Sequence, residues 1–191
     1  SRGIGLECVR QLLADPRVGC VYATCRRPGR ATELQALAKE EPERLIPLEL
    51  DVTDETSIED AAAVVGARSP RLHLLFNVAG LLHGEGEMFP EKRLADVRLE
   101  NLERSFRVNA FGPLLVAQAF QRLLTHGEHA VLANMSARVG SIDDNGFGGW
   151  YAYRGAKAAQ NMFTRNVAIE LGRKTSSLVC VALHPGTTDT G

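Results

Sequence analysis

The sequence lacks a charge imbalance, a long apolar run and a leader segment, and each absence argues against a class of protein. Its 191 residues carry a formal net charge of −1, so nothing indicates nucleic acid or an anionic membrane as a partner. No apolar run reaches the roughly 18 residues of a membrane-spanning helix. Residues 1–30 do not combine a basic start with an apolar stretch, as a signal peptide would. The sequence therefore predicts a cytoplasmic protein.

Cysteine and histidine patterns that would indicate a metal or a disulfide framework are also missing. The four cysteines show neither Cys-x-x-Cys nor zinc-ligand spacing, and we expect free thiols in a reducing compartment. The cysteines are Cys8, Cys20, Cys25 and Cys180. His126 and His129 fall in a polar turn, and no histidine pairs with another at metal-site spacing on a clear helix. The sequence predicts no metal site.

Apolar runs alternate with helix-like stretches along the whole chain. The predicted strands cover about 18–24, 45–50, 72–76, 130–135 and 178–183; the predicted helices cover about 6–13, 31–40, 55–65, 99–124 and a stretch from Tyr153 to 172. The apolar runs are continuous, which indicates parallel strands buried on both faces. The sequence therefore predicts an α/β fold with a doubly wound, Rossmann-type parallel sheet, as a single domain over residues 1–191.

Polar or turn-forming residues follow each predicted strand. These are Arg26, Asp51, Asn77, Ser136 and the Pro185-Gly186 turn. Ligands of doubly wound sheets bind beyond the carboxyl ends of the strands. The sequence therefore places a candidate ligand site at that edge of the sheet.

One pair of residues suggests the chemistry of this site. Tyr153 and Lys157 lie four residues apart, so on a helix their side chains share one face. A tyrosine with a pKa near ~10 is a poor proton donor at neutral pH. An ammonium about 4 Å away supplies roughly 4 kcal/mol at an effective dielectric near 20, which corresponds to a pKa lowered by about three units. The alternative is a solvated helix face with two unrelated polar side chains.

The order and spacing of the motifs resemble those of the short-chain dehydrogenase/reductases, in their compact single-domain branch. The matching residues are Ser1-Arg2-Gly3-Ile4-Gly5, Asp51-Val52, Asn77-Val78-Ala79-Gly80, Asn109, Ser136, Tyr153-x-x-x-Lys157 and Pro185-Gly186-x-x-x-Thr190. Two further runs look most like carbonyl-reductase-like members related to sniffer and C-signal proteins. These runs are Ala23-Thr24-Cys25-Arg26 and Gly148-Gly149-Trp150-Tyr151.

The resemblance implies a set of catalytic roles for an oxidoreductase that interconverts a carbonyl and an alcohol. Ser136 would position and polarise the carbonyl oxygen, and Tyr153 would pass the proton. Lys157 would hold the nicotinamide ribose and lower the pKa of Tyr153. Asn109 would bend its helix to hold a water molecule in the proton relay.

The resemblance also implies a nicotinamide cofactor, with NADP(H) preferred over NAD(H). The predicted strand over 18–24, which corresponds to the second strand of the family fold, ends in Thr24-Cys25-Arg26-Arg27 without a carboxylate. An acidic residue there would favour a free ribose hydroxyl. A guanidinium suits a phosphate group. The implied cofactor-binding residues are Ser1, Arg2, Gly3, Ile4, Gly5, Arg26, Asp51, Val52, Asn77, Ala79, Gly80, Tyr153, Lys157, Pro185, Gly186, Thr188 and Thr190.

The sequence departs from the family pattern at both ends. The expected first strand, with the first glycine of the phosphate loop, and the C-terminal helix and strand are not in the sequence, so we expect a partial domain. A small-molecule carbonyl or alcohol is the implied substrate, and the full-length protein is expected to be a homodimer or homotetramer. Two alternatives stay open: a non-catalytic cofactor-binding regulator on the same fold, and an inactive truncated product.

Overall fold

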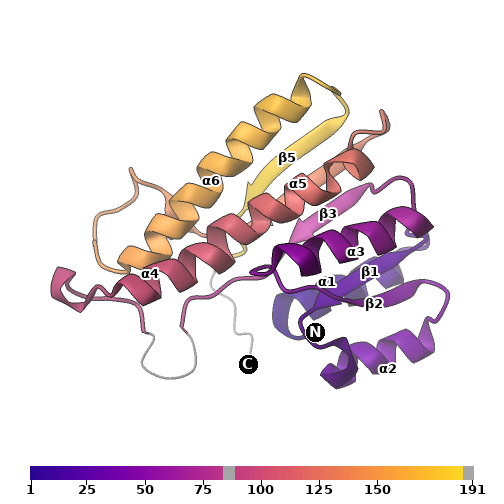
Figure 1. The fold of residues 1–191 in the computed structure, drawn as a ribbon, viewed down its shortest axis with the longest axis horizontal. Helices are drawn as coiled ribbons and strands as arrows, with labels where there is room; N and C mark the ends of the chain where they lie inside the picture. The colour runs from indigo at the N-terminus through magenta and orange to yellow at the C-terminus, as the bar shows by residue number, and fades with distance from the viewer. Residues whose placement is uncertain (84–88, 187–191) are drawn as a thin grey trace. The chain divides into compact units, whose positions relative to one another are not determined.

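The computed structural model describes residues 1–83 and 89–186. These residues form two compact units, one of residues 1–68 and one that begins at residue 69 (Figure 1). Within the described ranges, no helix is both long and apolar enough to cross a membrane. The prediction of one domain over the whole chain stays a prediction.

The first unit is a two-stranded parallel sheet with three helices. Its elements are α1 (Gly3–Ala14), β1 (Val21–Cys25), α2 (Thr32–Glu40), β2 (Leu45–Glu49) and α3 (Glu55–Arg68), with a short 3-10 helix at Pro28–Arg30. Strand β1 pairs with β2 in the register Val21 opposite Leu45. Apolar side chains at helical spacing on α1 pack in the core of this unit. The core contains Leu6 and Leu13 of α1 and Leu34 of α2.

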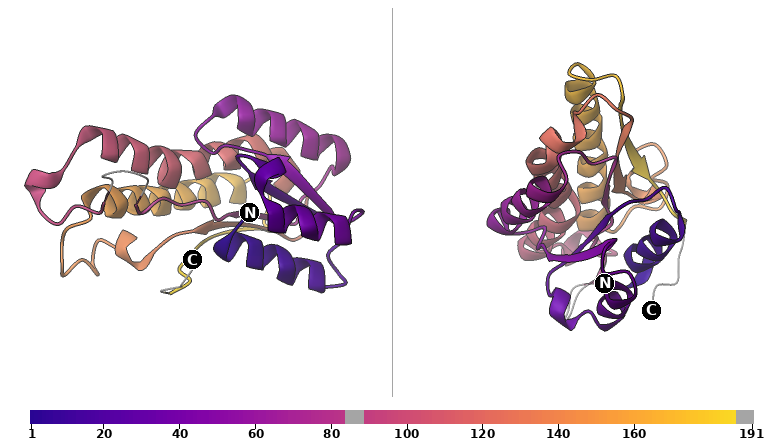
Figure 2. Two further views of the ribbon diagram at one scale, coloured as in Figure 1. Left: turned by 90° about the horizontal axis from the view of Figure 1, so that it is seen from below. Right: turned by 90° about the vertical axis from the view of Figure 1, so that its right-hand side faces the viewer.

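The second unit is a three-stranded parallel sheet in the order β3-β4-β5. Its main elements are β3 (Leu74–Asn77), α4 (Leu99–Phe106), α5 (Gly112–Leu124), β4 (Ala130–Met135), α6 (Tyr151–Gly172) and β5 (Leu178–Leu183), with short 3-10 helices at Leu94–Asp96 and Arg138–Gly140. Helices α4 and α5 run beside α6 (Figures 1 and 2). Leu124, Leu132 and Leu171 lie in the core between these layers.

Every strand pair in the described part of the chain is parallel. This confirms the predicted α/β fold with parallel, Rossmann-type sheets. The strands form two separate hydrogen-bonded sheets, β1-β2 and β3-β4-β5. A further strand before residue 1 and elements after residue 191 stay predictions.

The predicted helix over 99–124 is present, but its hydrogen-bond pattern changes in the middle. Residues Arg107–Phe111 form a π-helical segment between α4 and α5. A π segment widens the helix locally and occurs often at functional sites. Asn109 lies in this segment and is fully buried, so one of the predicted site residues sits where the helix changes its hydrogen-bond pattern.

Candidate active site

The carboxyl end of β4 positions Ser136. The backbone N–H of Ser136 donates to the carbonyl oxygen of Leu183, next to the end of β5, at 2.7 Å. The side chain is nearly buried, with 7% exposed. Its hydroxyl donates to Oδ1 of Asn161 on α6 at 2.6 Å. The predicted location of Ser136 at a strand end is thus what the structure shows, but its proton already has an acceptor.

Lys157 lies on α6 and is inserted under the end of β4. Only 2% of Lys157 is exposed, and its Nζ donates to the carbonyl oxygen of Met135 at 2.7 Å and to Oε1 of Gln160 at 3.1 Å. Burial lowers the pKa of Lys157 to about 8. A lysine with such partners is not part of a solvated helix face, so that alternative is excluded for Lys157.

Tyr153 lies one turn before Lys157 on α6 and is half-buried. The Lys157 Nζ is 5.7 Å from the centre of the Tyr153 ring. Burial raises the pKa of Tyr153, whereas the sequence predicted a lowered pKa. The difference has a physical cause: the hydrogen bonds of Nζ hold it at Met135 and Gln160, so the charge does not offset the loss of water around the phenol.

Asn109 joins the π segment to the loop after β3. Its Nδ2 donates to the carbonyl oxygen of Leu81 at 2.7 Å, and its Oδ1 accepts the backbone N–H of Leu81 at 2.9 Å. Gly80 lies beside this pair: a Cβ on Gly80 would be 3.4 Å from Asn109 Oδ1 and 3.9 Å from Lys157 Nζ. The structure therefore brings Gly80, Asn109 and Lys157 together, although they come from three separate elements.

Hydrogen bonds between buried polar side chains link β3, β4 and α6 next to the cluster of Gly80, Asn109 and Lys157. Asn77 Nδ2 donates to Asn134 Oδ1 at 2.8 Å, and Asn134 Nδ2 donates to Thr164 Oγ1 at 2.8 Å. Thr164 Oγ1 donates to the carbonyl oxygen of Gln160 at 2.8 Å, which completes a connection from β3 to the helix that carries Lys157. The N–H donor of the Asn77 side-chain amide is thus hydrogen-bonded within the protein. Sequence reasoning missed Asn134, Gln160 and Thr164.

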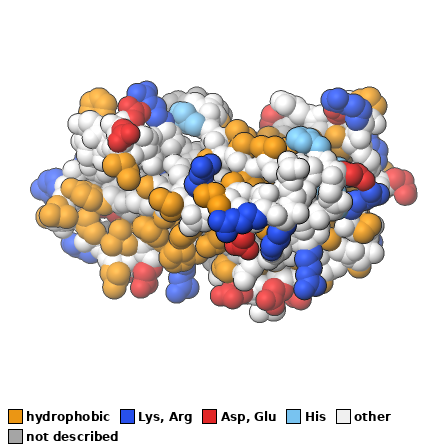
Figure 3. Space-filling model, turned by 90° about the horizontal axis from the view of Figure 1, so that it is seen from above, with side chains coloured by type: hydrophobic (Ala, Val, Ile, Leu, Met, Phe, Trp, Pro, Cys, Tyr) orange, Lys and Arg blue, Asp and Glu red, His pale blue; other side chains and the backbone are white. Residues whose placement is uncertain are grey.

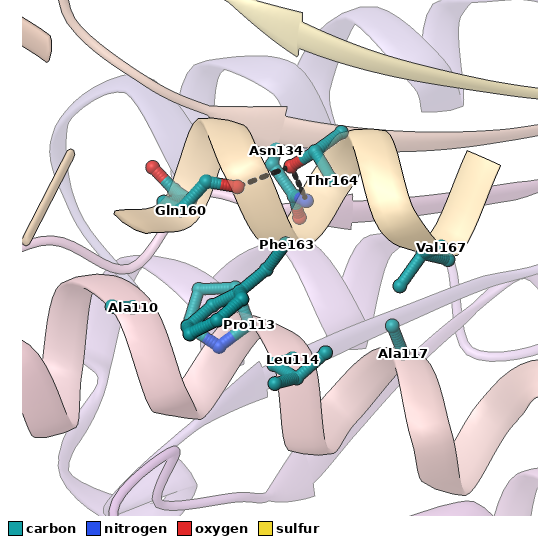
Figure 4. Close-up of a pocket in the computed structure, with 9 residues that line it drawn as sticks. All are labelled: Ala110, Pro113, Leu114, Ala117, Asn134, Gln160, Phe163, Thr164 and Val167. Carbon is teal, nitrogen blue, oxygen red and sulfur yellow. Dashed lines mark hydrogen bonds between the residues drawn. The ribbon is translucent and has the colours of Figure 1, made fainter. Parts of the chain in front are cut away.

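The space beside these buried side chains is not a substrate pocket. Figure 4 shows it between α6 and the stretch that joins the π segment to α5. Helix α6 contributes Gln160, Phe163, Thr164 and Val167, and the other side contributes Ala110, Pro113, Leu114 and Ala117. Its volume of about 10 Å³ is near that of a single water site. This space can therefore hold a water molecule but not a substrate.

Glu91 and Trp150 fix the start of α6, and sequence reasoning missed Glu91. Glu91 is buried, with 4% exposed; its carbonyl oxygen accepts the N–H of Trp150 at 2.5 Å, and its Oε2 accepts the N–H of Ala152 at 3.2 Å. Trp150 has a left-handed backbone, with φ 52°, which is rare for a bulky residue. Its ring lies edge-on to Tyr153 with centroids 6.4 Å apart. The hydrogen bonds to Glu91 therefore hold the Trp150 indole next to Tyr153.

Of the other predicted cofactor-binding residues, Ala79 and the turn after β5 belong to the second unit, and Ser1–Gly5, Arg26, Asp51 and Val52 belong to the first. Helix α1 begins at Gly3 with φ 54° and no side-chain cap, and Arg26 follows β1. Asp51 Oδ1 accepts the backbone N–H of Thr53 at 2.9 Å, so its carboxylate closes its own turn. Gly186 has φ 81°, as a tight turn requires. Thr188 and Thr190 lie outside the described residues.

A family profile described as short chain dehydrogenase matches residues 1–191. The chain is 30% identical over 191 residues to an uncharacterized oxidoreductase of Schizosaccharomyces pombe, C663.09c, and spans 71% of that protein. It is 41% identical over 93 residues to C-signal of Myxococcus xanthus, a match that covers 49% of this chain and 55% of C-signal.

Two solved structures are similar over 99% of this chain. The carbonyl reductase Sniffer of D. melanogaster has a TM-score of 0.88 and 31% identity, with 78% of that chain covered. A carbonyl reductase from chicken fatty liver, solved with NADPH bound, has a TM-score of 0.87 and 37% identity, with 74% of it covered.

Proposed function

Because this chain belongs to the short chain dehydrogenase family, as its motifs predicted, we propose that it transfers hydride between NADP(H) and a carbonyl/alcohol pair. One observation carries the proposal: the buried Lys157 ammonium lies between the end of β4 and the helix turn of Tyr153. A buried charge destabilises the folded protein. In a cofactor-dependent oxidoreductase the Lys157 ammonium would have a function that accounts for this loss of stability. Ser136 and Asn109 are placed around the same strand edge.

Two features of the structure fit a nicotinamide cofactor. Gly80 leaves bare backbone beside the Lys157 ammonium and the Asn109 amide, a surface that a ribose hydroxyl can approach closely. In the first unit, α1 begins without a side-chain cap on its free N–H groups, and such a terminus suits a phosphate. The cofactor supplies the hydride when it is bound; the protein residues orient the reactants and manage the proton.

The proton comes from Tyr153. Its hydroxyl donates to the carbonyl oxygen as that oxygen becomes an alcohol. The Lys157 ammonium, 5.7 Å from the ring centre, lowers the energy of the phenolate left behind but does not cancel the effect of burial. Ser136 then holds the carbonyl oxygen by a hydrogen bond. For Ser136 to donate to substrate, its proton must leave Asn161 Oδ1. Rotation of the Asn161 amide achieves this, because Nδ2 can donate to the Ser136 oxygen in place of Oδ1.

Free arginine side chains support NADP(H) over NAD(H). Arg2 and Arg26 are both exposed, and within the described residues neither forms an ion pair with a carboxylate. A guanidinium without a partner is available for the ribose phosphate. The NADPH bound to the chicken carbonyl reductase is consistent with this choice. Arg26→Asp should lower the NADPH preference, whereas Arg122→Asp, an exposed charge reversal on α5, should not.

The test is a turnover assay with the purified protein. NADPH or NADH is mixed with a panel of aldehydes, ketones and quinones, and the absorbance of the reduced nicotinamide is followed. Turnover supports the oxidoreductase. Cofactor binding without turnover of any substrate would instead support the non-catalytic regulator, and equal use of both cofactors would contradict the NADP(H) preference.

We propose a cytoplasmic homodimer or homotetramer, and the apolar surface of the second unit supports the oligomer. Leu94 is 73% exposed and Leu99 is 70% exposed, and hydrophobic side chains gather over the part that carries α4 (Figure 3). Exposed apolar patches commonly mark protein interfaces. Light scattering after size exclusion should therefore give a multiple of the chain mass, and Leu99→Glu should shift the protein toward the monomer.

A further inference from the structure

A cluster of metal-type ligands lies at the amino ends of β3 and β4, which is the opposite end of these strands from Asn77 and Ser136. His73 precedes β3, while His126 and Glu128 lie in the turn between α5 and β4. One ligand atom from each of the three side chains lies within 4.8 Å of the others. We propose that these residues bind a divalent transition-metal ion of the zinc type. The proposed oxidoreductase function makes no use of them.

The hydrogen bonds of His126 fix its tautomer and turn Nδ1 toward Glu128; a metal binds Nδ1 by displacing the backbone hydrogen bond that this nitrogen accepts. Nε2 of His126 is 2.9 Å from the carbonyl oxygen of Leu72, and a carbonyl can only accept, so Nε2 carries the proton. Nδ1 accepts the backbone N–H of Glu128 at 3.2 Å. A backbone carbonyl that fixes the ring and its tautomer is the usual support of a metal-binding histidine.

The remaining two ligand atoms already face each other. His73 Nε2 and Glu128 Oε2 are 3.0 Å apart, and the rings of His73 and His126 are 5.1 Å apart between centroids. Tetrahedral zinc, with ligands at about 2.0–2.2 Å, needs ligand atoms roughly 3.4 Å from one another. The side chains of His73 and Glu128 are 61% and 50% exposed, so both can rotate to this spacing.

The turn itself sets the spacing of two ligands. Gly127 separates His126 from Glu128 and has φ 89°, which an L side chain rarely adopts. This backbone reversal places the imidazole and the carboxylate on the same side. Two imidazoles and one carboxylate suit zinc better than magnesium or calcium, which prefer oxygen ligands. Sequence reasoning predicted no metal here, because His73 is 55 residues from Glu128.

Arg71 competes with the metal for Glu128. Its guanidinium pairs with Oε1 of Glu128, while His73 contacts Oε2. This ion pair leaves Oε2 available to a metal, but the positive charge of Arg71 repels a cation near the carboxylate. Removal of this charge should therefore strengthen metal binding, a gain that a damaged fold would not produce.

Metal titrations of the purified, chelator-treated protein test the site. We expect calorimetry to show one zinc ion per chain, and cobalt(II) to develop a tetrahedral visible spectrum. At about 100 times Kd, zinc should raise the thermal midpoint by roughly 5–10 °C. His73→Ala, His126→Ala and Glu128→Gln should each weaken binding at least about tenfold, and Arg71→Ala should strengthen it.

The matched control is His129→Ala, which removes an exposed imidazole from the same turn but outside the cluster. It should leave the affinity unchanged. The proposal is overturned by the absence of saturable one-to-one binding, by equal weakening in His129→Ala, or by tight binding that survives all three ligand substitutions. Each outcome is independent of turnover.

Discussion

Ser136 donates its hydroxyl proton to Oδ1 of Asn161 over 2.6 Å. In this arrangement the hydroxyl oxygen can accept a hydrogen bond, but its proton is not available to a substrate carbonyl. The Asn161 amide is held on its other side only weakly, since Nδ2 lies 3.4 Å from the carbonyl oxygen of Gly140. A rotated amide would donate to Ser136 and release the serine proton. Asn161 therefore controls whether Ser136 acts as a donor.

Asn161→Asp is expected to slow catalysis. A carboxylate accepts the Ser136 proton strongly and has no N–H with which to release it. We expect kcat to fall at least about tenfold, with little change in the affinity for NADPH. Asn145→Asp adds the same charge at an exposed loop position and should retain normal turnover. Full activity of Asn161→Asp would show that Ser136 does not need to donate.

Tyr153→Phe removes the proposed proton donor and keeps the ring. Turnover should fall below roughly a tenth of the wild-type value, since a positioned acid typically contributes ~10²–10⁴-fold, while NADPH binding by fluorescence should be nearly unchanged. Tyr151→Phe is the matched control, because Tyr151 is exposed at the start of the same helix. Comparable turnover of the two variants would refute the assignment to Tyr153.

Glu91→Ala should loosen the start of α6 and thereby the position of Tyr153. The substitution removes the acceptor of the Ala152 N–H and leaves a buried donor unpaired, at a cost of about 1–3 kcal/mol. Glu91→Gln keeps an acceptor oxygen and loses only the attraction between the charge and the helix N-terminus, about 0.3–1 kcal/mol. Urea denaturation of both variants measures the difference; equal losses would mean that the Ala152 hydrogen bond contributes nothing.

The sequence predicted the parts of the site that depend on strand ends and helix period. Asn77 ends β3 and Ser136 follows β4, both at the strand ends as expected, and Tyr153 and Lys157 share a face of α6. The partners of these side chains were not predictable, because they are set by contacts between distant segments. Ser136 meets Asn161 across 25 residues, and Glu91 reaches Ala152 across 61.

The same limit explains the π segment and the pKa of Tyr153. Nothing in the local sequence around Asn109 signals a wider helical turn; its amide is held by Leu81, which is 28 residues away. The spacing of Tyr153 and Lys157 predicted a direct charge effect, but Lys157 Nζ bonds to Met135 across 22 residues. Periodicity determines which side chains share a face, whereas packing determines where their polar ends go.

The burial of Lys157 gives the protein a stability that depends on pH in an unusual direction. Its pKa falls from 10.5 to about 8 on folding, so the folded chain binds fewer protons than the unfolded chain between these values. The penalty for the buried charge is complete below about pH 8 and disappears as the pH rises toward 10.5. This shift corresponds to a penalty on the order of 3 kcal/mol.

Lys157→Met should therefore remove a rise in stability above pH 8. We expect the free energy of unfolding of the wild type, relative to the variant, to increase between pH 7.5 and 10, by roughly 2–3 kcal/mol. Urea denaturation at both pH values measures it, and the difference between the proteins cancels other titrating groups. Lys174→Met is the control, since Lys174 is exposed and should give no such difference. At the same time Lys157→Met should lose both NADPH affinity and turnover, because the ammonium beside Gly80 serves both. A flat difference across this pH range would show that Lys157 keeps its ordinary pKa and that its charge is better solvated than its 2% exposure indicates.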